Sequence, residues 1–178
     1  MACSQTLSGI SNDCASNMGG IVEVYLANKA DVSSVTITSS KVTAISMNST
    51  AKFKTYHFRP NTSSMSSNYQ VNQENGTSYV QTDLLMVFNR METAKRIEVT
   101  TIAMAQGELC AIVKDANGLY WMLGIENPLV LSAGDGVTGT ARADRNGYSV
   151  TLQENSLEMP TEILVGQGGV DLSTIVAA

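Results

Sequence analysis

The chain has 178 residues, of which 43% are hydrophobic and 15% charged, with a formal net charge of −5. This length suits a single domain that can bury a sizeable core. The acidic balance without a basic stripe argues against tight binding to duplex DNA, because that affinity comes from neutralising phosphates. The low charged fraction, with abundant Ser, Thr and Asn, indicates surface that is covered rather than solvated, and self-assembly is one explanation.

Three further classes are disfavoured. No apolar stretch approaches the ~20 residues of a membrane span, and MACSQTLSGI lacks the basic start and apolar run of a signal peptide. A single His and three cysteines without a CxxC spacing make a zinc site unexpected. Cys3 and Cys14 are close enough in sequence to pair, but we expect all the cysteines to be unpaired in a reducing compartment.

The first half of the chain predicts an arm followed by strands. Residues 1–20 are rich in Ser, Gly and Asn and lack periodicity, so we expect an N-terminal arm that another surface must order. Residues 21–178 form the single predicted domain. It begins with a strand at 21–26 and continues with a hairpin of 32–38 and 41–47 that turns at Ser39–Ser40.

The segment KFKTYHFRP, residues 52–60, alternates in character and predicts a strand. Phe53, Thr55 and His57 are expected on one face, with Tyr56 and Phe58 on the other. Pro60 is expected to end the strand pairing. Asn75–Gly76 predicts a hairpin turn, so residues 52–82 are expected to form long antiparallel strands with an extended, mostly polar tip region. Within them, residues 59–70 are polar and predict a long loop.

One helix is predicted over about residues 90–106. Apolar or small residues recur there at helical spacing, namely Met91, Ala94, Ile97, Thr101, Ile102 and Ala105. Asn89 with Glu92 three residues later resembles a capping box, and Gly107 is expected to end the helix.

Strands dominate the remainder of the chain. DANGLYWMLG, residues 115–124, predicts a hairpin in a strand pair that follows the helix. Residues 127–139 predict a strand and a Gly-rich loop, and a further hairpin is expected to turn at 145–147. The predicted fold is mainly β, an antiparallel sandwich or partial barrel with one flanking α-helix and a long inter-subunit loop.

Trp121, the only tryptophan, marks either a ligand site or the core. Alternation places Leu119, Trp121 and Leu123 on one face, with Tyr120 and Met122 on the other. We favour the core, where the indole N–H is expected to meet a carbonyl.

No catalytic, cofactor or metal site is expected. The chain has neither GxSxG nor a phosphate-binding glycine motif, and His57 has no nucleophile and carboxylate arranged around it. Lys52, Lys54, His57 and Arg59 instead form a basic patch interleaved with aromatic residues. Such a patch suits either stacking of single-stranded nucleic acid or a protein contact, and the acidic balance favours the protein contact.

Three stretches together are similar to the tail tube proteins of long-tailed bacteriophages. They are CSQTLSGISNDCASNMGGIVEVYLANKADV, FRPNTSSMSSNYQVNQENGTSYVQTDLLMVF and VKDANGLYWMLGIENPLVLSAGDGVTGTARADRNGYSVTLQE. The N-terminal segment, which contains Cys and Gly, also resembles structural proteins of phages that infect gut Bacteroidetes. The resemblance rests on the order of elements and covers most of the chain.

This resemblance implies a virion protein, assembled in the host cytoplasm, that forms hexameric rings stacked into a tube. The tube would surround a tape-measure protein and later pass double-stranded DNA without specific binding. The expected inter-subunit residues are Lys52, Lys54, His57, Arg59, Asn61, Met65, Tyr69, Tyr120 and Met122. Two alternatives remain: a neck-ring or tail-completion protein of the same fold, and a sandwich module that binds carbohydrate or cell surfaces through Tyr120, Trp121 and Tyr148.

Overall fold

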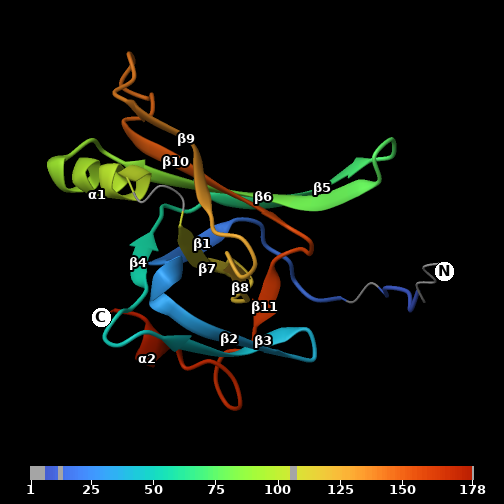
Figure 1. Ribbon diagram of the computed structural model, residues 1–178. Helices are drawn as coiled ribbons and strands as arrows, with labels where there is room; N and C mark the ends of the chain where they lie inside the picture. The colour runs from blue at the N-terminus through green and yellow to red at the C-terminus, as the bar shows by residue number, and fades with distance from the viewer. Residues whose placement is uncertain (1–6, 12–13, 105–107, 178) are drawn as a thin grey trace.

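The computed structural model describes residues 7–11, 14–104 and 108–177 (Figure 1). Eleven strands make up most of it. The strands are β1 Ile21–Asn28, β2 Val32–Thr38, β3 Lys41–Met47, β4 Lys54–His57, β5 Ser64–Asn72, β6 Thr77–Asn89, β7 Leu109–Asp115, β8 Tyr120–Leu123, β9 Val130–Val137, β10 Gly147–Ser156 and β11 Thr161–Ile163. The helical elements are α1 Thr93–Met104, the short α2 Leu172–Ile175 and a 3-10 turn at Lys29–Asp31.

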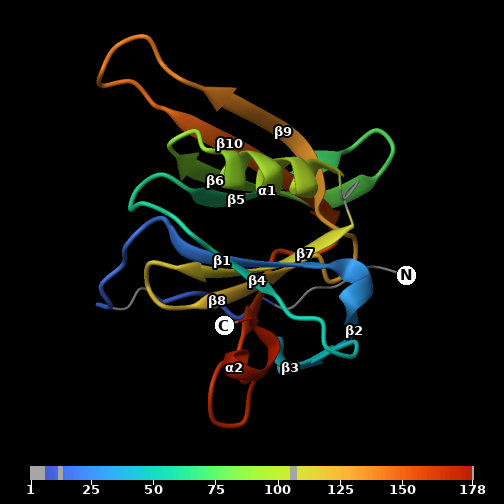
Figure 2. The same cartoon turned by 90° about the vertical axis from the view of Figure 1, so that its left-hand side faces the viewer.

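The strands form two sheets that lie one above the other (Figures 1 and 2). The larger has seven strands in the order β2-β3-β11-β8-β7-β1-β4, and the smaller has four in the order β5-β6-β10-β9. Almost all pairings are antiparallel, the exception between named strands being β11 with β3. The predicted mainly β sandwich with a flanking helix is therefore confirmed.

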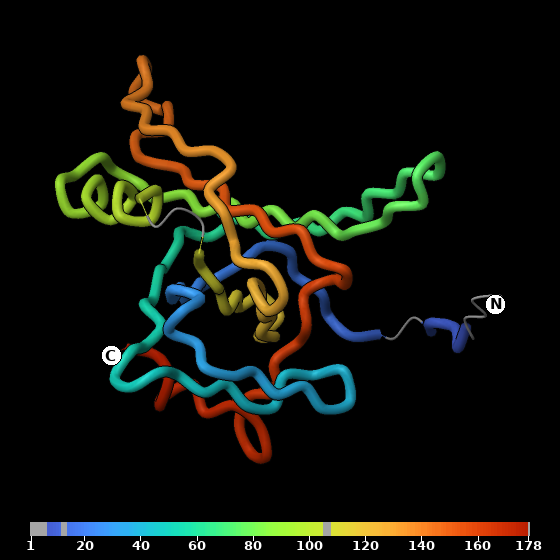
Figure 3. The backbone as a smooth tube through the Cα atoms, viewed as in Figure 1, coloured from blue at the N-terminus to red at the C-terminus, as the bar shows by residue number. Residues whose placement is uncertain are grey.

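The two faces of the central strands β1, β7 and β8 each contribute to a core. One core lies between the sheets and includes Val24, Leu84, Val113 and Leu152. The second lies on the opposite face, where the seven-stranded sheet curls around Phe53 and Ile112 (Figure 3). Because β7 is covered on both sides, its residues LCAIV are all buried, which explains their continuous apolar run.

The C-terminal segment helps to close the curled sheet. The backbone N–H of Phe53 donates to the carbonyl of Ile175 at 2.8 Å, and that of Ala177 donates to the carbonyl of Phe53 at 2.8 Å. Phe53 itself is fully buried, whereas Tyr56 and Phe58 pack against the core between the sheets. The predicted division of this strand's aromatic side chains between two faces is confirmed.

The hairpin within DANGLYWMLG is confirmed as the β7–β8 turn. The Asp115 N–H donates to the Leu119 carbonyl at 2.9 Å, and Gly118 has a φ of +85°. Trp121 faces the core between the sheets, as expected, and Tyr120 packs against the other core. The expected carbonyl partner of the indole was wrong, because Trp121 Nε1 donates to the carboxylate of Asp115 at 3.1 Å.

Several predicted boundaries were wrong. Strand β5, Ser64–Asn72, begins inside the predicted 59–70 loop and pairs with β6 along its whole length. The predicted Gly-rich stretch before residue 139 is largely strand β9, and the connection to β10 spans residues 138–146. Both strands are rich in small polar or Gly residues, so their pairing with a neighbour, rather than apolar alternation, defines them.

The helix α1 begins later than predicted. Asn89 is the last residue of β6, so it does not cap the helix, and Arg90 has a φ of +62° between the two elements. Only Ile102 of the helix is fully buried, while Ile97 is 53% exposed. The expected stop at Gly107 and the expected apolar position Ala105 lie outside the described residues.

The described part of the N-terminal arm, residues 7–11 and 14–20, is exposed and contains neither helix nor strand up to Gly19. Its root is held by the β7–β8 turn. The Met18 N–H donates to Asn117 Oδ1 at 2.8 Å, and Asn117 Nδ2 donates to Asn17 Oδ1 at 3.0 Å. Beyond this anchor the arm leaves the body of the protein (Figure 1), with Leu7 and Ile10 almost completely exposed.

Candidate assembly surface

The four-stranded sheet covers the core with only one of its faces. Along β6, Val80, Thr82, Leu84 and Met86 are fully buried, whereas the residues between them are only partly buried. Residues of β10 alternate in the same way. The opposite face of this sheet, called the outer face below, is covered by no other element of the described chain (Figure 1).

Polar, mostly uncharged side chains form rows across the outer face. Register places Asn68, Gln81 and Asn155 in one row, and Ser66, Asp83 and Gln153 in the next. Gln153 Nε2 donates to Asp83 Oδ1 at 2.8 Å, and Gln81 Nε2 donates to Asp83 Oδ2 at 3.3 Å. These two rows therefore share a hydrogen-bonded amide and carboxylate network. The same alternation along β6 puts Tyr79, Leu85 and Val87 on the outer face as well.

The cation that reaches this face is neutralised. Arg145 Nη2 contacts Asp135 Oδ2 at 2.7 Å, and Ser149 Oγ also donates to Asp135. These two hydrogen bonds, that of Ser149 first, lower the pKa of the Asp135 carboxyl. Asp83 carries no ion pair among the described residues, so the outer face has a net negative charge.

Both edges of the four-stranded sheet are free in the described chain. β5 pairs only with β6, and β9 pairs only with β10. Residues Val130 to Gly136 of β9 are all exposed, and Gly134 and Gly136 leave its backbone uncovered. A free edge presents unpaired N–H and C=O groups to another strand, so this sheet offers two complementary edges for pairing.

The predicted basic patch lies on and beside the edge strand β4 of the other sheet. Lys52, Lys54, His57 and Arg59 are exposed. His57 Nδ1 lies 3.4 Å from Glu23 Oε1, and Glu23 also bonds Lys114 and Tyr25. The hydrogen bond from Tyr25 is the largest of the effects that lower the pKa of Glu23.

The aromatic residues of this patch are not presented for stacking on bases. Phe53 is completely buried, and the rings of Tyr56 and Phe58 pack against Phe88 at centroid distances of 6.1 and 5.6 Å. Tyr56 also donates to Glu98 of α1 at 2.5 Å. The buried aromatic rings therefore argue against the stacking interpretation, and a protein contact made by the exposed cations stays a prediction.

The remaining predicted contact residues are divided between surface and core. Asn61 is exposed and Tyr69 is 61% exposed, but Met65 is half-buried against the core between the sheets. Tyr120 is half-buried, with Lys114 Nζ 5.8 Å from its ring centroid. Met122 is only 1% exposed, so its prediction as a contact residue was wrong: alternation placed it correctly on the second face, but that face is buried too.

The structure does not bring Tyr120, Trp121 and Tyr148 to one surface. Tyr120 and Trp121 face different cores, and Tyr148 is 9% exposed. A carbohydrate-binding platform needs exposed aromatic faces on one side. These three residues do not provide it.

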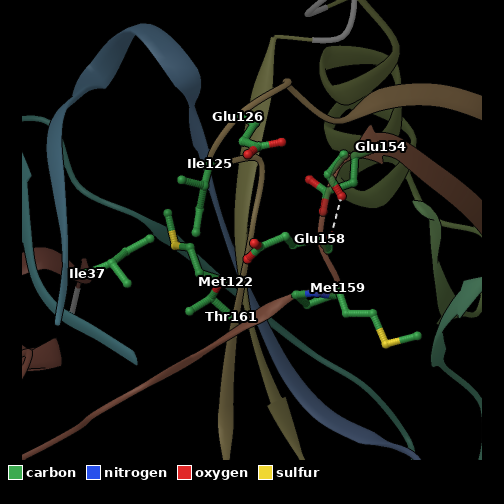
Figure 4. A pocket seen from close by; sticks show the side chains of 10 residues that line it. Ile37, Met122, Ile125, Glu126, Glu154, Glu158, Met159 and Thr161 are labelled. Carbon is green, nitrogen blue, oxygen red and sulfur yellow. Dashed lines mark hydrogen bonds between the residues drawn. The ribbon is translucent and has the colours of Figure 1, made fainter. Parts of the chain in front are cut away.

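One acidic cavity was not predicted. Glu154 of β10 is 5% exposed, and with Glu126 and Glu158 it lines a cavity of about 70 Å³ beside Met122 (Figure 4). The Gly124 N–H donates to Glu154 Oε2. The signal was in the sequence: Tyr148, Val150, Leu152 and Glu154 alternate, which puts the carboxylate at an inward position.

Within the described ranges, no group of His, Cys, Asp or Glu side chains is arranged to hold a metal ion. Cys14 is exposed and unpaired, and Cys110 is buried, which raises its pKa to about 12. Cys3 lies outside the described residues. No helix in the part of the chain that the structure describes is long and apolar enough to cross a membrane.

Comparisons with known proteins add no relative. The sequence matches no protein-family model, no curated protein and no solved structure.

Proposed function

We propose that the chain is a non-enzymatic structural subunit that assembles into rings, which stack into a tube of the bacteriophage tail-tube kind. The observation that carries the proposal is the four-stranded sheet, which has two free edges and one uncovered polar face. Identical subunits that meet head to tail close into rings when the rotation between them closes. Pairing β5 of one subunit with β9 of the next would remove both free edges.

The chemistry of the outer face suits the lining of a conduit for DNA. The two rows through Gln81 and Asp83 are made of Ser, Asn and Gln side chains with the carboxylate of Asp83 between them. Phosphate groups are held by cations, and Arg145 is already paired with Asp135. Double-stranded DNA would therefore pass such a surface without being retained.

The β5–β6 hairpin favours an assembly of stacked rings rather than a single ring. It extends well beyond the body of the protein (Figure 1), and most of its tip is exposed. Ordering a free, polar hairpin costs conformational entropy, and only contacts with another surface compensate for that cost. A neck-ring or tail-completion protein is the second candidate, because the same edges would close a ring that does not stack.

Proline substitutions in β9 test the role of the free edge. Successive N–H groups of a strand point to opposite sides, and proline removes the N–H of the residue that it replaces. Of the two variants Ala133→Pro and Gly134→Pro, one therefore removes an N–H of the free edge, and the other removes a hydrogen bond to β10. We expect the variant that keeps its circular dichroism spectrum to remain a monomer in light scattering. Ring formation by that folded variant at the wild-type concentration would contradict edge pairing.

A further inference from the structure

One face of α1 carries an apolar stripe that the subunit leaves uncovered. Ala94, Ile97, Thr101 and Met104 recur at three and four residues and therefore share a face. Ile97 is 53% exposed and Met104 is 75% exposed. Ala94, Ile97 and Thr101 belong to the periodic set from which the sequence predicts the helix, yet another face of the helix is the one held to the subunit.

The attachment of α1 uses different residues. Val99 and Ile102 pack against the core between the sheets, and Glu98 accepts the hydroxyl of Tyr56. The stripe is therefore not needed to hold the helix in place. A surface helix normally buries its apolar stripe, so this one indicates a partner outside the subunit.

The charges around the stripe are predominantly basic. Glu92 is paired with Lys95 at 2.6 Å, and Glu98 is bonded to Tyr56. The exposed cations on or beside α1 and β4 have no ion pair within the described ranges, and these are Lys52, Lys54, Arg59, Arg90 and Arg96. A partner surface that is apolar and acidic would complement this side.

Such a surface lies at the other end of the subunit. Met65 and Ser67 of β5 face the core side of their sheet. Alternation along the strand therefore puts Tyr69 and Val71 on the same side, the underside of the β5–β6 hairpin, where they are 61% and 66% exposed. The connection after β10 adds Leu157, which is 72% exposed. In Figure 1 this connection lies below the hairpin, on the side away from α1.

The charge at this end is acidic. Residues 61–89 and 146–178 contain no Lys or Arg. Glu74 at the hairpin tip is exposed, as are Glu126 and Glu158 beside the β10–β11 connection, and none has an ion pair in the described part of the chain.

We propose that the α1 stripe of one subunit packs beneath the β5–β6 hairpin of a second copy, with Arg96 and its neighbouring cations facing the acidic β10–β11 connection. The inference rests on the proposed self-assembly and names a pair of surfaces that meet. Because the two surfaces are different and lie at opposite ends, each copy offers both, and the contact repeats head to tail.

The test compares a stripe variant with a matched helix variant. Ile97→Glu/Met104→Glu places two carboxylates in the apolar contact, whereas Ala103→Glu adds one at an exposed position on another face of the same helix. We expect the double variant to keep the wild-type circular dichroism spectrum. Losing two buried aliphatic side chains should raise the concentration needed for assembly by about tenfold or more in sedimentation velocity. Ala103→Glu should assemble like the wild type.

A charge exchange provides the second arm. Arg96→Glu and Glu158→Arg should each weaken assembly, and the two changes together should restore part of it. Normal assembly of Ile97→Glu/Met104→Glu would overturn the inference and leave the proposed function intact. A wild-type protein that stays monomeric at all concentrations would instead contradict the proposed function, and the inference with it.

Discussion

At the scale of single residues, Glu154 is the one acidic or basic side chain that is buried among the described residues. It lies between the two sheets, where burial raises the pKa of its carboxyl to about 7. The hydrogen bond from Gly124 and the charge of Lys29 oppose this effect, and Glu126 adds to it. In the folded protein the carboxyl is therefore protonated at pH values at which it is ionised in the unfolded chain.

This difference predicts a specific pH dependence of stability. The folded pKa lies above the unfolded value of 4.5, so the contribution of Glu154 is complete below about 4.5 and is lost as pH rises through about 7. Relative to Glu154→Gln, we expect the wild-type free energy of unfolding to fall by about 3 kcal/mol between pH 4 and pH 8. Urea denaturation of both proteins over this range measures the difference.

The exposed Glu74 at the hairpin tip provides the control for this comparison. Glu74→Gln makes the same chemical change at an exposed side chain, so it measures the effect of the substitution without burial. Parallel curves for the wild type and Glu154→Gln would show that the Glu154 carboxyl is not desolvated by the fold.

At the scale of elements, the β2–β3 hairpin contains a strained turn. Ser39 and Ser40 have φ values of +53° and +62°, a conformation that suits Asn and Gly in a two-residue hairpin turn. We expect Ser39→Asn/Ser40→Gly to raise the free energy of unfolding by roughly 1 kcal/mol, because it relieves left-handed strain. Chemical denaturation measures this change. Ser39→Ala/Ser40→Ala should have the opposite sign, and an equal effect of both pairs would disprove the strain.

The elements also show which sequence patterns are sufficient to predict a strand or a turn. The β7–β8 hairpin was predicted because Asn117–Gly118 forms the turn and large apolar residues alternate after it. Residues 64–70 of β5 were predicted as loop because the inward Ser67 is satisfied by a hydrogen bond with Thr82 at 2.8 Å, so the alternation carries little apolar signal. The periodicity of α1 predicted a helix but not its buried face, because helical periodicity does not say whether an apolar stripe is covered by its own subunit.

The candidate assembly surface was only partly predictable, because the sequence of one strand does not show what packs against it. The basic patch of Lys52 to Arg59 is exposed as expected, because charged residues next to a strand end are rarely buried. Met122 is buried because β8 has a core on both faces, and a single strand's sequence does not reveal that second layer. The outer-face rows depend on register between β5, β6 and β10, which only the fold fixes.

At the scale of the whole molecule, the two sheets differ in how far they are covered: the seven-stranded sheet closes around its own core, and the four-stranded sheet has free edges. The curled seven-stranded sheet surrounds a core of its own. The four-stranded sheet ends in two unpaired strands and leaves its polar face uncovered. This division separates the part of the subunit that is closed on itself from the part whose free edges are proposed to pair with other copies.

The central claim is that the protein assembles by itself. Negative-stain electron microscopy of the purified wild-type protein, over a concentration series followed by light scattering, tests it most directly. The account predicts rings with a central hole and, at higher concentration, stacked tubes. A monodisperse monomer at every concentration, with no rings in the images, would contradict it.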